Sequence, residues 1–232
     1  DHNTSQDLVN DIEKLLNHVS MDSVHVFAGS WGSTLGMLYT IEHPDKVKSM
    51  ILRGYFPGTK EAKSFFEQGG TAYFHPEEWA RLNRLVPDEA RTNVSQYYLT
   101  QLLSEDESHA AEYANELVYY NVATAKIGIS EQEIHMIMNT GDNLGKALIQ
   151  CHYSANDFFL EDNYIIDRAD ILSDIPITII HGRYDMICPL SYAYELNQKL
   201  DKSKLIIVTG GHLSSEPEIE KELVSALNQL TN

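Results

Sequence analysis

Cysteine, basic side chains and long apolar runs are all scarce in this chain of 232 residues. Its two cysteines, Cys151 and Cys188, lie in no CxxC or metal-like spacing. That argues against a disulfide scaffold and favours a reducing compartment, so we expect a cytoplasmic location. No apolar run approaches membrane-spanning length, and the first residues lack the character of a signal peptide. The ten histidines include no HExxH motif, and we expect neither a metal nor another cofactor.

Positive charge is half as frequent as negative charge. The 17 Lys and Arg residues face 34 Asp and Glu residues, which gives a formal net charge of −17. Nucleic acids and anionic membrane surfaces are bound by clustered Lys and Arg, so we expect neither as a partner. The chain is 43% hydrophobic, which is enough for one substantial core with a subsidiary lobe. Composition therefore predicts a globular protein but does not identify its substrate.

The stretch VHVFAGSWGSTLGML, from Val24 to Leu38, sets a lone serine between two glycines. The residues before Ser30 have the pattern of a buried strand, and those from Trp31 to Glu42 have the pattern of a helix. No turn-length linker separates the two, and such a corner strains the backbone. This is the setting of the nucleophile elbow G-x-S-x-G, here with Ala28 in place of the first glycine. The alternative is a serine that only caps the helix.

Strands and helices alternate around this motif. Apolar residues at helical spacing predict a helix from Ser5 to Val19. Strand patterns occur at Val24 to Ala28 and at Lys48 to Gly54, and the helix between them ends near His43-Pro44. Strand, helix and strand in this order favour a parallel sheet with helices on both faces, so the predicted fold class is α/β.

The pattern changes after Phe56-Pro57-Gly58. From Thr59 to about Asp170 helical periodicities dominate, which predicts an all-helical cap inserted into the sheet domain. Further helices are predicted from Leu190 to Leu200 and from Glu216 to Leu230. The predicted domains are 1–57 and 171–232 for the core and 58–170 for the cap.

Two later strands, at Ile177 to His181 and at Lys204 to Val208, are each followed closely by a titratable residue, Asp185 and His212. Because the carboxyl ends of parallel strands meet at one edge of a sheet, we expect both residues beside Ser30. The order Ser, Asp, His along the chain is that of the α/β-hydrolases. In such a triad the histidine takes the serine proton and the carboxylate orients the imidazole. Taken singly, the aspartate could instead close an Asx-turn, and the histidine could be a packed loop residue.

These segments resemble the proline iminopeptidase family of α/β-hydrolases, most closely at FAGSWGSTL, HPDKVKSMILRGYF, HGRYDMICP and GGH. The resemblance extends over nearly the whole chain. It implies an N-terminal aminopeptidase that removes proline, with an all-helical cap over the site and no metal or cofactor. It also implies that Ser30 is the nucleophile, Asp185 the orienting acid and His212 the general base. The Trp31 backbone N–H is then one donor to the oxyanion.

The sequence departs from this family in the cap. The family binds the free amine of its substrate with two cap carboxylates, and the matching positions here are Asn121 and Gln150. A neutral amide accepts a hydrogen bond from an ammonium group but supplies no charge, and charge-assisted bonds are roughly twice as strong. His152 and Tyr153 are further substrate-binding candidates. If the match is shifted, the anchoring acid is one of Glu116, Asp157, Glu161 or Asp162.

A second departure lies at the front of the fold. The family has further strands before the first helix, with a His-Gly-Gly-Pro-Gly-like loop that supplies the other oxyanion donor. Without these strands, the strand at Val24 to Ala28 lies at an open edge of the sheet. We therefore expect a fragment, self-association, or a missing N-terminal segment that covers the edge. One lost oxyanion donor costs on the order of 10²–10³ in rate.

Three functions follow from these patterns. The leading one is a serine hydrolase that releases an N-terminal proline, or a similar small residue, from peptides through an acyl-enzyme intermediate. The second is a serine esterase or amidase of the same fold with altered specificity. The third is a catalytically impaired homologue that acts as an interaction protein. The expected partner of either enzyme is a peptide or a small amide or ester substrate.

Overall fold

The computed structural model describes residues 3–230. The chain forms two compact units, one from residues 3–59 and 159–230 and the other from residues 60–158. The first unit contains the β-sheet of the described residues. Each unit has a buried apolar core of its own. We describe the two units separately, as a sheet unit and a helical unit.

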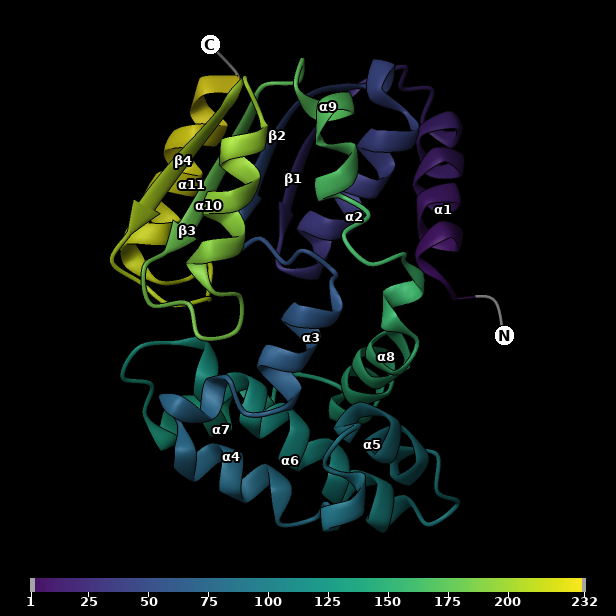
Figure 1. The fold of residues 1–232 in the computed structure, drawn as a ribbon, viewed down its shortest axis with the longest axis vertical. Helices are drawn as coiled ribbons and strands as arrows, with labels where there is room; N and C mark the ends of the chain where they lie inside the picture. Colours follow the sequence, from purple (N-terminus) through teal and green to yellow (C-terminus); the bar gives the residue numbers. More distant parts are fainter. Residues whose placement is uncertain (1–2, 231–232) are drawn as a thin grey trace. The chain divides into compact units, whose positions relative to one another are not determined.

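The sheet of the described residues has four parallel strands in the order β1-β2-β3-β4 (Figure 1). Their bounds are Val24–Gly29 for β1, Val47–Arg53 for β2, Ile177–Gly182 for β3 and Ser203–Val208 for β4. The inner strands β2 and β3 are buried along almost their whole length, as is typical of parallel strands covered on both faces. The predicted parallel sheet is confirmed, with nearly the predicted bounds.

One face of the sheet is covered by a layer of helices. This layer consists of α2 (Trp31–Glu42), α9 (Ala169–Leu172) and α10 (Leu190–Lys199). Helix α9 contacts both α2 and α10, and α10 contacts β3 and β4. Helix α1 (Ser5–His18) packs against α2. The elbow helix α2 is thus held between the sheet and α1.

The opposite face is covered by α11 (Pro217–Leu230), whose Ile219 packs on Ile51 of β2. The side chain preceding Ile51, that of Met50, lies at α2 instead, because successive side chains of a strand point to opposite faces. Helices therefore cover both faces, as predicted. Helix α11 packs on β2, β3 and β4, and Phe27 of β1 remains 53% exposed.

All regular elements of residues 60–158 are helical, which confirms the predicted helical insertion. Helices α5, α6 and α8 pack on one another and form most of its core. Within residues 3–230, no helix is long and apolar enough to cross a membrane. The α-helices of this unit are α3 (Lys60–Glu67), α4 (Pro76–Asn83), α5 (Val94–Leu102), α6 (Glu107–Ala125), α7 (Glu131–Met138) and α8 (Asn143–Ala155).

The helical unit ends at Phe158, earlier than the predicted boundary at 170. Ile165, Ala169 and Leu172 are buried, and α9 contacts α2 and α10 of the sheet unit. This segment therefore completes the layer over the sheet. Helical periodicity missed this because it shows which residues are buried but not which element buries them.

Candidate active site

Ser30 lies at the corner where β1 ends and α2 begins. Its φ of 56° and ψ of −129° are strained for a residue that carries a Cβ atom. The Ser30 N–H donates to Arg53 O on β2 at 2.8 Å, and Ser33 Oγ donates to Ser30 O at 2.5 Å. All of α2 is described, and the Ser30 side chain makes no capping hydrogen bond to it. The helix-capping alternative is therefore wrong.

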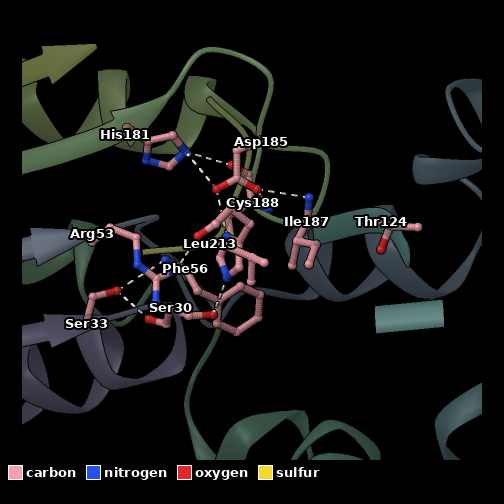
Figure 2. Close-up of polar contacts among 12 residues, drawn as sticks. Ser30, Ser33, Arg53, Phe56, Thr124, His181, Asp185, Ile187, Cys188 and Leu213 are labelled. Atoms are coloured by element: carbon pink, nitrogen blue, oxygen red, sulfur yellow. Dashed lines mark hydrogen bonds and ion pairs between the residues drawn. The ribbon is translucent and has the colours of Figure 1, made fainter. Parts of the chain in front are cut away.

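His212 lies between Ser30 and Asp185, beyond the carboxyl ends of the strands. Its Nε2 is 2.9 Å from Ser30 Oγ, and its Nδ1 is 2.7 Å from Asp185 Oδ2. Ser30 and Asp185 are labelled in Figure 2. Because Nδ1–H donates a hydrogen bond to the carboxylate, Nε2 is left to accept a hydrogen bond from the Ser30 hydroxyl. The sheet unit thus brings the three predicted residues into the arrangement in which a histidine can take a proton from serine.

Asp185 is buried, with 4% of its surface exposed, and uses both carboxylate oxygens. Oδ1 accepts from the N–H groups of Ile187 and Cys188 at 3.0 and 2.8 Å, which closes an Asx-turn. The Asx-turn alternative therefore holds together with the contact from Oδ2 to His212. Burial alone would raise the pKa of Asp185, but the rings of His212 and His181 and the Cys188 N–H outweigh burial and lower it.

A second histidine, His181 on β3, lies beside the same carboxylate and is completely buried. Its Nε2 donates to Cys188 O at 2.8 Å and is 3.5 Å from Asp185 Oδ2. Burial lowers the pKa of His181 and outweighs the attraction of Asp185. Among the described residues its Nδ1 has no hydrogen-bond partner. Sequence reasoning passed over His181, although a lone titratable residue in the strand pattern ITIIH was the available signal.

Arg53, at the end of β2, connects the elbow to the loop that carries His212. Its carbonyl accepts from Ser30, and its Nη1 donates to His212 O at 2.7 Å. A Cβ atom added at Gly29 would be 2.6 Å from Arg53 Nη2, so the glycine of the elbow makes room for this guanidinium. The sequence signal for Arg53 was a charged residue that ends the apolar strand KSMILRG.

Asp185, Cys188 and His212 are also close enough to be considered as metal ligands, since one ligand atom from each lies within 4.8 Å of the others. The carboxylate oxygens of Asp185, however, already accept hydrogen bonds from N–H groups and from His212. Burial raises the pKa of the Cys188 thiol well above its ordinary value, so the thiol stays protonated and is a poor ligand. These groups fit a hydrogen-bonded triad better than a metal site.

Asn121 and Gln150 are hydrogen-bonded to each other in the helical unit, where they lie on α6 and α8. Asn121 Nδ2 donates to Gln150 Oε1 at 2.5 Å, and Gln150 Nε2 donates back to Asn121 Oδ1 at 3.4 Å. The two cap positions that the resemblance singled out are thus neighbours in space. Two amides attract each other here, whereas two ionised carboxylates at this separation would repel.

The alternative anchoring acids, of which Glu161 and Asp162 fall in the sheet unit, are mostly engaged with cations. Asp162 is exposed, and the other three form ion pairs. These are Glu116 with Arg81 at 2.7 Å, Asp157 with Lys63 at 2.9 Å and Glu161 with Arg168 at 3.3 Å. The carboxylates of Glu116, Asp157 and Glu161 are therefore already paired with cations of the protein itself.

The remaining predicted residues fall in both units. Trp31 is the first residue of α2, so its backbone N–H lies at the positive end of the helix dipole. His152 and Tyr153 lie on α8, with ring centroids 5.5 Å apart, and Tyr153 is buried. Trp31 thus belongs with the triad in the sheet unit, and His152 and Tyr153 belong with the cap positions of the helical unit.

Known proteins resemble this chain both in sequence and in fold. The alpha/beta hydrolase fold family matches residues 1–218. A proline iminopeptidase of Arabidopsis thaliana is 35% identical over 97% of this chain, and one of Xylella fastidiosa is 34% identical over 97%. The chain spans 60% of the length of the first relative and 72% of the second. A bromoperoxidase structure from Bacillus anthracis, 15% identical, matches all of this chain and 76% of its own with a TM-score of 0.64, which is a likeness of fold alone.

Proposed function

This chain belongs to the proline iminopeptidase family of α/β-hydrolases, and on that premise we propose that it is a serine hydrolase that releases an N-terminal proline, or a similar small residue, from peptides. One observation carries the proposal. His212 lies within hydrogen-bond distance of both Ser30 and Asp185, at 2.9 and 2.7 Å. That geometry activates a serine hydroxyl for attack on a carbonyl carbon. The substrate class rests on the family.

The first half of the reaction forms an acyl-enzyme. His212 Nε2 takes the hydroxyl proton of Ser30 as Oγ attacks the carbonyl carbon of the first peptide bond, and Asp185 stabilises the resulting imidazolium. The tetrahedral intermediate then collapses and its C–N bond breaks. The amine of the shortened peptide leaves with the proton from His212, and the N-terminal residue remains as an ester on Ser30.

Water completes the cycle. It attacks the ester carbon while His212 takes one of its protons, and the same proton returns to Ser30 Oγ as the C–O bond breaks. The free amino acid leaves, and the hydroxyl is restored. Asp185 stays ionised at neutral pH, since its pKa is lowered.

The oxyanion of each tetrahedral intermediate needs hydrogen-bond donors. The Trp31 N–H directly follows the nucleophile and lies at the N-terminus of α2, where the aligned peptide dipoles favour negative charge. It is therefore assigned as one oxyanion donor. Removing one such donor typically costs on the order of 10²–10³ in rate, so the activity of this chain depends on a second.

In the cap, the proposal assigns the amine end of the substrate to Asn121 and Gln150, with His152 and Tyr153 on the same helix as Gln150. The neutral pair offers acceptors but no charge, so it should bind a free amine more weakly than carboxylates would. This observation favours a second candidate, a serine esterase or amidase whose substrate needs no free amine.

A fluorophosphonate probe tests the proposed chemistry. The wild-type chain should be labelled in proportion to its concentration, and Ser30→Ala should not be labelled. Ser214→Ala, which changes an exposed serine near His212, is the matched control and should label like the wild type. Hydrolysis of a proline arylamide supports the aminopeptidase. Hydrolysis of simple esters, with no hydrolysis of the proline arylamide, supports the serine esterase or amidase. A chain that neither labels nor hydrolyses either substrate would show that the proposed chemistry is wrong.

A further inference from the structure

The loop between β4 and α11 carries His212 and is held by a buried carboxylate that the reaction itself does not use. Glu216, the residue before α11, is 6% exposed. Its Oε1 accepts from Gly211 N at 3.0 Å and from Leu213 N at 3.2 Å, and its Oε2 accepts from Gly211 N at 3.0 Å. One side chain thus binds the backbone N–H groups on both sides of His212.

Two further contacts hold the backbone of this loop. The His212 carbonyl accepts from Arg53 at 2.7 Å, and Figure 2 shows Arg53 and Leu213 beside the triad. The loop also lies tightly over the end of β3, since a Cβ atom added at Gly182 would be only 2.0 Å from Gly211 O. The peptide group after His212 is thus held at both its C=O and its N–H, and the backbone is also held at Gly211 N before it, so the Cα–Cβ direction of His212 is set before a substrate arrives.

Capping of α11 does not by itself explain the position of the Glu216 carboxylate. The first backbone bond of the helix, from Glu220 N, goes to the Glu216 carbonyl, while the carboxylate reaches back to the His212 loop. A buried carboxylate is costly unless hydrogen bonds compensate for the lost water. Here the loop supplies those bonds, so the carboxylate and the loop conformation stabilise each other.

We propose that Glu216 is a positioning residue whose carboxylate holds the His212 loop so that the imidazole stays between Ser30 and Asp185. The proposal rests on the proposed serine-hydrolase function. Its physical basis is that a misplacement of about 1 Å can cost on the order of 10² in rate. Loss of the hydrogen bonds from Glu216 to the loop should therefore lower kcat and should not weaken substrate binding.

Four variants separate this role from a general loss of stability. Glu216→Ala removes both acceptor oxygens, and Glu216→Asp draws the carboxylate back by one methylene group. Both should lower kcat, and the rate of fluorophosphonate labelling, by at least about tenfold with KM within about twofold. Glu216→Gln keeps one acceptor oxygen for both N–H groups and should stay within about threefold of the wild type. Glu220→Ala removes an exposed carboxylate from the first turn of α11 and should behave like the wild type.

A second measurement does not depend on turnover. The proton between His212 Nδ1 and Asp185 should give a low-field proton NMR signal, assigned by its loss in Asp185→Ala. This signal should persist in Glu216→Gln and Glu220→Ala and broaden or disappear in folded Glu216→Asp and Glu216→Ala. If the wild type neither labels nor turns over, the proposed function fails, and the NMR comparison still decides the role of Glu216. A signal and labelling rate in folded Glu216→Asp that match the wild type would overturn the positioning role.

Discussion

At Ser30 the backbone adopts a strained conformation, with φ at 56°, that places the hydroxyl within 2.9 Å of His212 Nε2. Strain of this kind costs on the order of 1–3 kcal/mol, and it persists only where surrounding contacts enforce it. The bonds from Ser30 N to Arg53 and from Ser33 to Ser30 O supply that enforcement. The effect of replacing such a residue therefore depends on the neighbours that hold it in place.

The triad should act as a single unit. Ser30→Ala and His212→Ala should each remove nearly all turnover, because without either partner no proton moves from serine to histidine. The double variant should be hardly slower than either single variant. Steady-state kinetics on a proline arylamide, with circular dichroism as a folding control, measure this. Substantial activity in Ser30→Ala would show that another residue is the nucleophile.

The amide pair in the cap should weaken the preference for substrates with a free N-terminal amine over N-acetylated ones. The wild type should prefer a proline arylamide over its N-acetylated form by only ~1–2 kcal/mol, because a neutral acceptor replaces a charged one. Gln150→Glu should increase that preference, and Gln6→Glu, which adds the same charge in the sheet unit, is the matched control. A wild-type preference above about a thousandfold, or ~4 kcal/mol, would show that other acids anchor the amine.

His181 should make the protein less stable at mildly acidic pH. Burial lowers the pKa of His181 below the ordinary 6.5, so the unfolded chain binds a proton that the folded chain does not. The free energy of unfolding should therefore fall as the pH drops below 6.5 toward the folded pKa, by at most about 1.4 kcal/mol per pH unit. His181→Gln can keep the donor to Cys188 O and does not titrate, so its profile should be shallower between pH 6.5 and 5. Parallel profiles from urea unfolding of the two proteins would contradict this.

At the scale of elements, the distance between α2 and β1 depends on glycine. A Cβ atom at Gly36 would lie 2.9 Å from Val26 Cγ1, whereas one at Gly32, on the same helix, would first meet Ala28 Cβ at 3.9 Å. Close packing of α2 therefore needs glycine at the first position but not at the second.

Alanine at these two positions should have opposite effects on the free energy of unfolding. Gly32→Ala should raise it by up to about 1 kcal/mol, since alanine favours helix. Gly36→Ala gains the same propensity but must push α2 away from β1, so we expect a net loss of about 1–2 kcal/mol. Denaturant unfolding of both variants tests the pair, and equal changes would mean that α2 adapts without cost.

At the scale of the 232-residue chain, the edge of β1 that no described strand pairs with and the net charge act in opposite directions. Among the described strands β1 pairs only with β2, and it contains neither Lys nor Pro to protect its free side. Strand β4, at the other edge, carries the exposed Lys204. The net charge of −17 repels a second copy, and salt screens that repulsion.

We therefore expect the 232-residue chain to self-associate through β1, and more strongly at higher salt. Phe27→Lys places a charge on the exposed face of this strand and should shift the protein toward monomer. Ile207→Lys makes the same change on β4 and is the matched control, with little effect expected. Sedimentation velocity at about 0.05 and 0.5 M salt measures both. A wild-type chain that is monomeric at both concentrations would contradict the expectation.

Much of this protein could be predicted from local patterns. Ser30, Asp185 and His212 each follow a strand-like run, and parallel strands end at one edge of a sheet, so their proximity followed from chain order. The α/β alternation and the helical insertion were also evident, because side-chain periodicity reflects which faces are buried. Each of these predictions starts from a pattern among residues that are near one another along the chain.

Contacts between distant residues were decided only by the tertiary structure. The bond from Arg53 to His212 joins positions 159 residues apart, and the pairing of Asn121 with Gln150 joins two helices. The burial of His181 and the assignment of residues 159–170 to the sheet unit likewise depend on which elements pack together. Sequence periodicity indicates that a face is buried, but the partner that buries it, and the hydrogen bonds that then become obligatory, arise only when the elements assemble.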